Sequence, residues 1–217
     1  MTTKSETYAG RVKYDAERAA RYKHKRPEKH RAEMRLIDRA FAFVPKTHRV
    51  LDVPCGTGRV TLHLTSKGYR VNPADLSDAM REAASETVKV AGLNCVVERQ
   101  DVEQLSYADR SFDTVLCFRL FHHFPNADIR RRVIGELSRV ASEFVVLSYF
   151  HPSLSTVQRK LRAKRTGKLV NKHATTLAEV EGYFAEAGFR LVKDFAQLRM
   201  IHTLHVAVFE RTGENPR

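Results

Sequence analysis

The sequence predicts a doubly wound α/β fold, in which a seven-stranded, mostly parallel sheet carries helices on both faces. Short apolar segments typical of buried strands alternate along the chain with segments whose apolar residues recur every three or four positions. Strands that alternate with helices pair in parallel and are covered on both faces. The 217 residues suit one domain, and a hydrophobic content of 42% is enough to form its core.

Residues 1–45 are expected to form a helical cap that belongs to the same domain. Met34, Ile37 and Phe41 mark one apolar helix face, and Pro45 ends that helix. The alternation of strands and helices then begins, so the main domain is assigned to residues 46–217. Its strands are expected over residues 49–53, 69–72, 94–98, 114–118, 144–149, 191–198 and 204–209, and Pro73 is expected to end the second.

Helices are expected between these strands. The first covers residues 60–67 and stops at Gly68. Ser77 and Asn126 are suited to begin the next two helices, because a short polar side chain accepts from the free N–H groups of a first turn. Thr176 and Glu179 have the spacing of a capping box at the start of the last helix.

The net charge of +13 is confined to two segments. Residues 1–35, the N-terminal basic segment, carry 11 basic and 5 acidic side chains. Residues 155–175, the internal basic segment, carry 7 basic and no acidic ones, and the rest of the chain has 20 charges of each sign. The internal segment is expected to form a basic lid inserted at about residues 152–175. Such segments favour an anionic partner.

Composition argues against several classes of protein. No apolar run approaches the roughly 20 residues that span a bilayer, and residues 1–10 lack a signal-peptide core, so neither a transmembrane segment nor a leader is expected. The 3 cysteines are scattered, which favours a reduced, cytoplasmic protein over a disulfide scaffold. Zinc-type Cys/His spacing is absent, so no metal site is expected.

The end of the first expected strand carries an acidic residue followed by a Gly-x-Gly turn. Gly56 and Gly58 let a ligand approach the backbone closely, although a tight turn without a ligand also uses such residues. Thr61 stands where a dinucleotide fingerprint has a third Gly or Ala, and the Gly-Lys-Ser/Thr of a phosphate loop is missing. The carboxylate of Asp52 would repel a pyrophosphate, so this turn favours a ligand with positive charge and no phosphate.

Asp75 follows the second strand, 17 residues after Gly58. In nucleotide-binding folds an acidic side chain at a spacing of about 20 residues binds ribose hydroxyls. A carboxylate can accept hydrogen bonds from both hydroxyls of a ribose. The alternative is that Asp75 caps the next helix, a task for which Ser77 and Asp78 are also available.

The segment Val50–Gly58, Val-Leu-Asp-Val-Pro-Cys-Gly-Thr-Gly, resembles the first motif of the class I (Rossmann-like) S-adenosylmethionine-dependent methyltransferases. The likeness is strong over residues 48–150 and weak over 174–210, with Pro54 and Pro73 as departures. It implies the Rossmann-like methyltransferase fold and S-adenosyl-L-methionine as cofactor. It also implies that the cofactor is bound by Asp52, Pro54, Gly56, Gly58, Asp75, Leu76, Asp101, Val102, Cys117 and Phe118.

A His-His pair follows the fourth strand, where the resemblance puts the transferred methyl group. His122 or His123 is therefore a candidate catalytic base, since histidine titrates near neutral pH. The alternative is that both histidines line the cofactor pocket or pack structurally. The same turn would place Arg119 beside the methionine part of the cofactor.

In this family the N-terminal helices and an insertion after the fifth strand cover the acceptor, and the two basic segments occupy these places. The resemblance and the charge together predict a methyltransferase for a small, anionic acceptor, either a metabolite or a lipid or glycolipid headgroup. Tyr14, Tyr22, Tyr149 and His151 are candidates to contact it. Two alternatives stay open. The first is an RNA or DNA methyltransferase, which the missing Asn/Asp-Pro-Pro-Tyr/Phe motif disfavours, and the second is a non-catalytic cofactor-binding partner protein. The sequence leaves the oligomeric state open.

Overall fold

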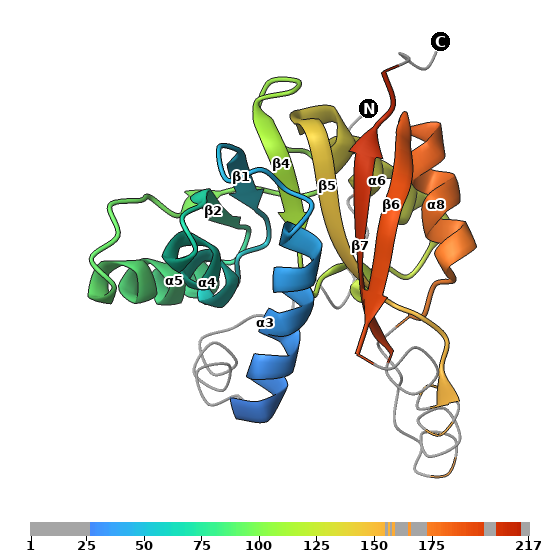
Figure 1. The fold of residues 1–217 in the computed structure, drawn as a ribbon, viewed down its shortest axis with the longest axis horizontal. Coiled ribbons are helices and arrows are strands. Elements are labelled where there is room, and N and C mark those ends of the chain that lie inside the picture. Colours follow the sequence, from blue (N-terminus) through green and yellow to red (C-terminus); the bar gives the residue numbers. More distant parts are fainter. Residues whose placement is uncertain are drawn as a thin grey trace.

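A seven-stranded sheet forms the centre of the structure, a computed structural model that describes residues 27–154, 173–197 and 203–213, together with residues 156, 158 and 165 (Figure 1). The strands are β1 (Arg49–Asp52), β2 (Arg70–Asp75), β3 (Glu98–Arg99), β4 (Phe112–Cys117), β5 (Ala141–Phe150), β6 (Phe189–Ala196) and β7 (Leu204–Arg211). Their order is β3-β2-β1-β4-β5-β7-β6. Only β7 pairs antiparallel with its neighbours, so the prediction of a mostly parallel sheet is confirmed.

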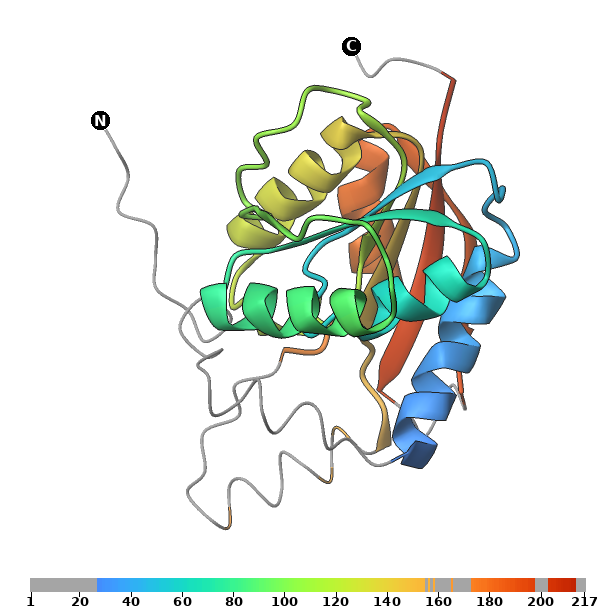
Figure 2. The same cartoon turned by 90° about the vertical axis from the view of Figure 1, so that its left-hand side faces the viewer.

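Helices cover both faces of this sheet, which confirms the doubly wound fold (Figure 2). They are α3 (Pro27–Phe41), α4 (Arg59–Ser66), α5 (Asp78–Val90), α6 (Ala127–Val140) and α8 (Leu177–Glu186), with a short 3-10 turn, η1 (Phe121–His123). The apolar faces of α3 and α4 pack on one side of β1, β4, β5 and β7. Those of α6 and α8 pack on the other side.

The predicted helix starts are confirmed by side-chain caps. Ser77 Oγ accepts from the Met80 N–H at 3.4 Å, and Asn126 Oδ1 accepts from the Ile129 N–H at 3.0 Å. Thr176 Oγ1 accepts from the Glu179 N–H at 3.2 Å. Each cap satisfies one donor that the first helical turn leaves without an intrahelical partner.

The prediction that Pro73 ends the second strand is wrong, because β2 continues through it to Asp75. The carbonyl of Ala74 accepts from the Cys55 N–H on the β1 side, so the backbone of Pro73 faces the β3 side. There the pairing with β3 starts only at Ala74. Proline has no backbone N–H, but at this position no hydrogen bond between strands requires one.

The third strand is also shorter than predicted, since β3 contains only Glu98–Arg99 and not residues 94–98. It lies at the edge of the sheet and pairs only with the last two residues of β2. Val96 is 80% exposed, so its apolar side chain does not mark a buried strand. A valine-rich pattern alone could not show that the chain here lacks a partner to pair with.

Both predicted covering segments fall largely outside the described residues. Of the helical cap, the structure describes α3 and the turn that follows it, and α3 packs on the sheet through Met34, Ile37 and Phe41, as its apolar pattern predicts. Of the predicted lid, the internal basic segment is described only at its ends and at isolated positions. The arrangement of these two segments as cap and lid stays a prediction.

Candidate functional site

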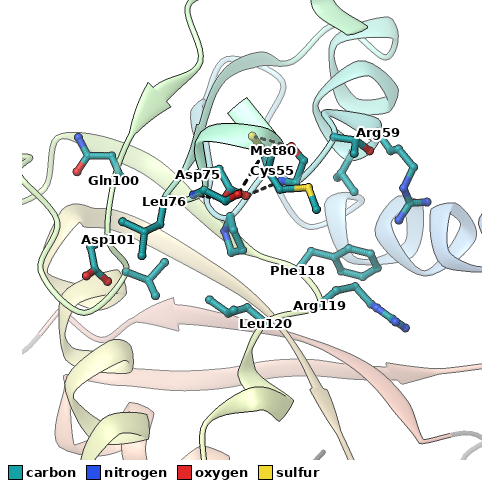
Figure 3. A pocket seen from close by; sticks show the side chains of 16 residues that line it. Cys55, Arg59, Asp75, Leu76, Met80, Gln100, Asp101, Phe118, Arg119 and Leu120 are labelled. Carbon is teal, nitrogen blue, oxygen red and sulfur yellow. Dashed lines mark hydrogen bonds between the residues drawn. The ribbon is translucent and has the colours of Figure 1, made fainter. Parts of the chain in front are cut away.

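The chain forms a pocket at the carboxyl ends of β1, β2, β3 and β4 (Figure 3). Its walls come from the last residue of β2 and from the segments that follow the four strands, together residues 54–57, 75–77, 100–102 and 118–120. Arg59 and Val60 of α4 and Met80 of α5 complete the lining. The strand order reverses between β1 and β4. In parallel sheets, such a switch point is where the loops diverge and leave room for a ligand.

The turn after β1 is built on two glycines with left-handed backbone conformations. Gly56 has a φ of 58° and Gly58 has a φ of 78°, positive values that residues other than glycine rarely adopt. A Cβ atom at Gly56 would meet no atom within 4 Å, so the backbone there faces open space. The predicted Gly-x-Gly turn thus brings bare main chain to the pocket, and Gly58 is the N-cap residue that precedes α4.

Asp75 holds this turn and lines the pocket at the same time. Its Oδ2 accepts from the Gly56 N–H and its Oδ1 from the Ser77 N–H, both at 2.9 Å. Burial raises the pKa of this carboxyl to about 6, although the backbone hydrogen bonds oppose the rise. Ser77 caps α5, so Asp75 is not needed for that cap. It supports the turn after β1 and faces the pocket.

Asp52 lies beneath the turn and does not line the pocket. Its side chain is 1% exposed, and Oδ2 accepts from the Thr61 hydroxyl at 2.7 Å. Oδ1 is buried and has no hydrogen-bond partner among the described residues. Burial raises the pKa of Asp52 to about 7, with the nearby charge of Asp75 adding to the rise. Such a shift next to a pocket is typical of functional sites.

The pocket is polar at both ends. Gln100 and Asp101 lie at one end in Figure 3, Arg59 and Arg119 lie at the other, and Asp75 stands between them. Gln100 is fixed by Ser106, whose backbone N–H donates to its Oε1 at 3.0 Å. Asp101 Oδ1 accepts from the Glu103 N–H at 3.0 Å, which orients this carboxylate at the start of its loop.

The two arginines are held by one buried carboxylate, that of Glu33 on α3. Arg59 Nη2 lies 3.1 Å from Glu33 Oε2, and Arg119 Nη1 lies 3.2 Å from Glu33 Oε1. Glu33 is only 2% exposed. Arg119 has a φ of 67°, an unfavourable conformation for a residue with a side chain, and its backbone N–H donates to Ser148 Oγ at 2.6 Å. The fold thus keeps Arg119 in a strained position at the pocket wall.

The two candidate catalytic histidines lie in η1, and neither lines this pocket. His122 is 2% and His123 5% exposed. The His122 ring stacks on Phe150 at 3.9 Å between ring centroids, and its backbone carbonyl accepts from the His173 N–H at 2.8 Å. Both rings are therefore packed side chains, and a catalytic role for either of them stays a prediction.

The four candidate acceptor contacts are not brought together in the described part of the chain. Tyr149 is fully buried in β5, and its hydroxyl donates to Asp194 Oδ1 at 3.2 Å. His151 stacks on His205 at 4.8 Å beyond the end of β5. Tyr14 and Tyr22 lie outside the described residues. Neither Tyr149 nor His151 lines the pocket.

Most of the predicted cofactor-binding residues do meet in the pocket. Those that line it are Pro54, Gly56, Asp75, Leu76, Asp101, Val102 and Phe118. Those that do not line it are Asp52, Gly58 and Cys117, and the Cys117 side chain is packed in the core on the α6 side. Sequence reasoning missed Arg59, Gln100 and Glu33. For Glu33 a signal exists, because it lies four residues before Ile37 on the apolar face of a helix, where a charge is unexpected.

Neither a metal-ion site nor a membrane-spanning helix is found in the part of the chain that the structure describes. No group of three or more His, Cys, Asp and Glu side chains there could hold a metal ion. Within the same described ranges, no helix is long and apolar enough to cross a bilayer.

Comparison with known proteins identifies the domain around this pocket. The model of a family described as a methyltransferase domain matches residues 50–143. The chain is 30% identical over 152 residues to ajmaline N-methyltransferase of Rauvolfia serpentina, a match that covers 61% of this chain and 50% of that protein. It is 36% identical over 107 residues to phosphatidylethanolamine N-methyltransferase of Cereibacter sphaeroides, covering 47% of this chain and 51% of that one. The chain spans about half the length of these relatives.

A solved structure has the same fold over nearly the whole chain. Magnesium protoporphyrin IX methyltransferase of Synechocystis with bound SAH superposes with a TM-score of 0.75 and 18% identity, covering 90% of this chain and 94% of that one. At this identity the likeness shows the fold alone. Together with the motif after β1 and the matched domain, it leads to one conclusion: residues 50–143 form a methyltransferase domain, and the chain has the Rossmann-like methyltransferase fold.

Proposed function

We propose that this protein transfers a methyl group from S-adenosylmethionine to a small, anionic acceptor. The observation that carries the cofactor assignment is the order of polar groups along the pocket, with Gln100 and Asp101 at one end, Asp75 in the middle and two arginines at the other. S-adenosylmethionine has an adenine, a ribose, a sulfonium and an amino-acid carboxylate in the same order. When bound, it supplies an activated methyl group on sulfur.

The residues present fit this cofactor. Asp75 can accept from both ribose hydroxyls, and the absence of any atom near a Cβ at Gly56 leaves room for a ligand against the backbone. The buried carboxylate of Asp52 beneath the turn favours a cation above it. Arg59 and Arg119 would hold the carboxylate, because guanidinium groups pair with carboxylates in a bidentate way.

Arg119 is expected to recognise only the amino-acid part of the cofactor. In Arg119→Met the affinity for S-adenosylhomocysteine should fall about tenfold to 100-fold, the effect of losing one charge-assisted hydrogen bond. The affinity for 5′-methylthioadenosine, which lacks the amino-acid part, should change less than threefold. Calorimetric titration measures both. Arg131→Met is the matched control, because Arg131 lies on the surface of α6 and pairs with Glu186. Equal losses for the two ligands would refute this assignment.

The proposal of an anionic acceptor rests on where the two basic segments meet the described fold. The N-terminal basic segment leads into α3, where His30 contacts the Arg59 guanidinium at 2.7 Å. The internal basic segment begins soon after β5 and ends where Thr175 N–H donates to the Phe150 carbonyl at 2.7 Å. Both therefore join the body at the carboxyl edge of the sheet, beside the pocket. Positive charge at that place favours a negatively charged acceptor.

A panel of acceptors tests this proposal. The panel contains carboxylate and phosphate metabolites, vesicles of phosphatidylglycerol, vesicles of neutral lipid, RNA and duplex DNA, each with S-adenosylmethionine labelled in its methyl group. Transfer to an anionic metabolite or to the anionic vesicles is expected. Transfer confined to RNA or DNA, with binding that falls steeply with salt, would contradict the proposal in favour of a nucleic-acid methyltransferase. For the acceptor found, His122→Ala and His123→Ala under single turnover test whether either histidine accepts a proton.

A further inference from the structure

The carboxylate of Glu33 contacts both arginines of the pocket. It reaches them from α3, a helix outside the residues 50–143 matched by the methyltransferase domain. Each of its carboxylate oxygens faces a different guanidinium group, at 3.1 and 3.2 Å. The carboxylate is almost entirely withdrawn from solvent, so water screens its charge weakly.

Arg59 and Arg119 bring two positive charges to this end of the pocket, and the Glu33 carboxylate that contacts both of them offsets part of that charge. In Glu33→Gln this offset would be lost at the end of the pocket assigned to the methionine part. That part also carries the sulfonium of the cofactor, which two positive charges would repel.

We infer that Glu33 is a positioning residue that sets the preference of the pocket for the cationic cofactor over the neutral product. This inference rests on the proposed function and deepens it. S-adenosylmethionine has a positive sulfur that carries the methyl group, whereas S-adenosylhomocysteine lacks this methyl group and has a neutral thioether; the rest of the two molecules is the same. The negative charge of Glu33 offsets the repulsion between the arginines and the sulfonium. Its carboxylate also holds the two guanidinium groups in place for the ligand carboxylate, an effect shared by both ligands.

The ratio of the two affinities isolates the charge effect. Calorimetric titration of the full chain with each ligand gives two dissociation constants, and any loss of carboxylate binding cancels in their ratio. In Glu33→Gln the ratio of the dissociation constant for S-adenosylmethionine to that for S-adenosylhomocysteine should rise about tenfold. In Glu33→Asp, which keeps the charge, the ratio should stay within about twofold of the wild-type value. Arg119→Gln removes positive charge and should lower the ratio.

Asp38→Asn is the matched control, because Asp38 lies on the same helix and pairs with His63 at 2.7 Å and Lys67 at 3.3 Å away from the pocket. Circular dichroism at the titration temperature checks that each variant is folded. If Glu33→Gln weakened both ligands equally, Glu33 would be a structural residue only and the inference would be overturned. Failure of the wild type to bind either ligand would overturn the proposed function and this inference together. A rise of the ratio in Glu33→Gln, without such a rise in Glu33→Asp or Asp38→Asn, supports the proposed function and this inference.

Discussion

Replacing Asp75 by alanine is expected to weaken the binding of S-adenosylmethionine at least 100-fold. The carboxylate would lose two charge-assisted hydrogen bonds to ribose, each of which contributes about 1.5–3 kcal/mol. It would also stop holding the Gly56 and Ser77 N–H groups, which fix the turn after β1 and the start of α5. Calorimetric titration of the wild type and the variant measures the loss.

Asp78→Ala serves as the control for this result. Asp78 lies three residues further on, is exposed and pairs with Arg81 on the surface of α5. Its replacement should leave cofactor affinity within about twofold of the wild type. Asp75→Asn should be intermediate, because the amide keeps one acceptor oxygen. Unimpaired binding in Asp75→Ala would show that the ribose does not lie beside Asp75.

Replacing Asp52 by asparagine is expected to stabilise the fold while it weakens cofactor binding. Burial raises the pKa of Asp52 from 3.8 to about 7, so the folded state favours the protonated acid. One pKa unit corresponds to about 1.4 kcal/mol, so the ionised form destabilises the fold by up to about 4 kcal/mol above pH 7. Asparagine removes this penalty and can still accept the hydrogen bond from Thr61. The cofactor cation loses a buried counter-charge, so its affinity should fall about tenfold.

The sign of the pH dependence follows from the raised pKa. Protonated Asp52 contributes stability that is fully present below pH 4 and is lost as the pH rises through about 7. The melting temperature of Asp52→Asn should therefore be close to that of the wild type at pH 4 and exceed it by about 8–16 °C at pH 8. Thermal unfolding followed by circular dichroism measures both values. A variant that is less stable at pH 8 would mean that Asp52 is not a buried destabilising charge.

The sheet and most helices could be predicted because their local signals agree with the final packing. Ser77, Asn126 and Thr176 cap helices as their side-chain chemistry requires. Errors arose where pairing decides the structure. Pro73 stays within β2 because its neighbour β3 starts one residue later, and Val96 stays exposed because β3 is so short. Neither fact is contained in the local sequence.

The pocket residues also divide into those that local sequence signals predict and those that depend on the completed fold. Gly56 and Asp75 could be found from spacing, because the loops after β1 and β2 are short and lie side by side in every fold of this topology. Glu33 could not be assigned a role, since its partners Arg59 and Arg119 are 26 and 86 residues away along the chain and meet it only after the sheet has formed. Asp52 was expected to face the ligand, yet it lies under the turn because β1 directs it inward.

A crystal structure of the full chain with S-adenosylhomocysteine tests the central claim most directly. We predict density along the pocket, with the adenine beside Asp101 and Val102, the ribose hydroxyls at Asp75, and the carboxylate at Arg59 and Arg119. Density in the reverse direction, with the adenine at the arginines, would contradict the assignment of the two ends. Absence of the ligand from this pocket at millimolar concentration would contradict the claim that this is the cofactor site.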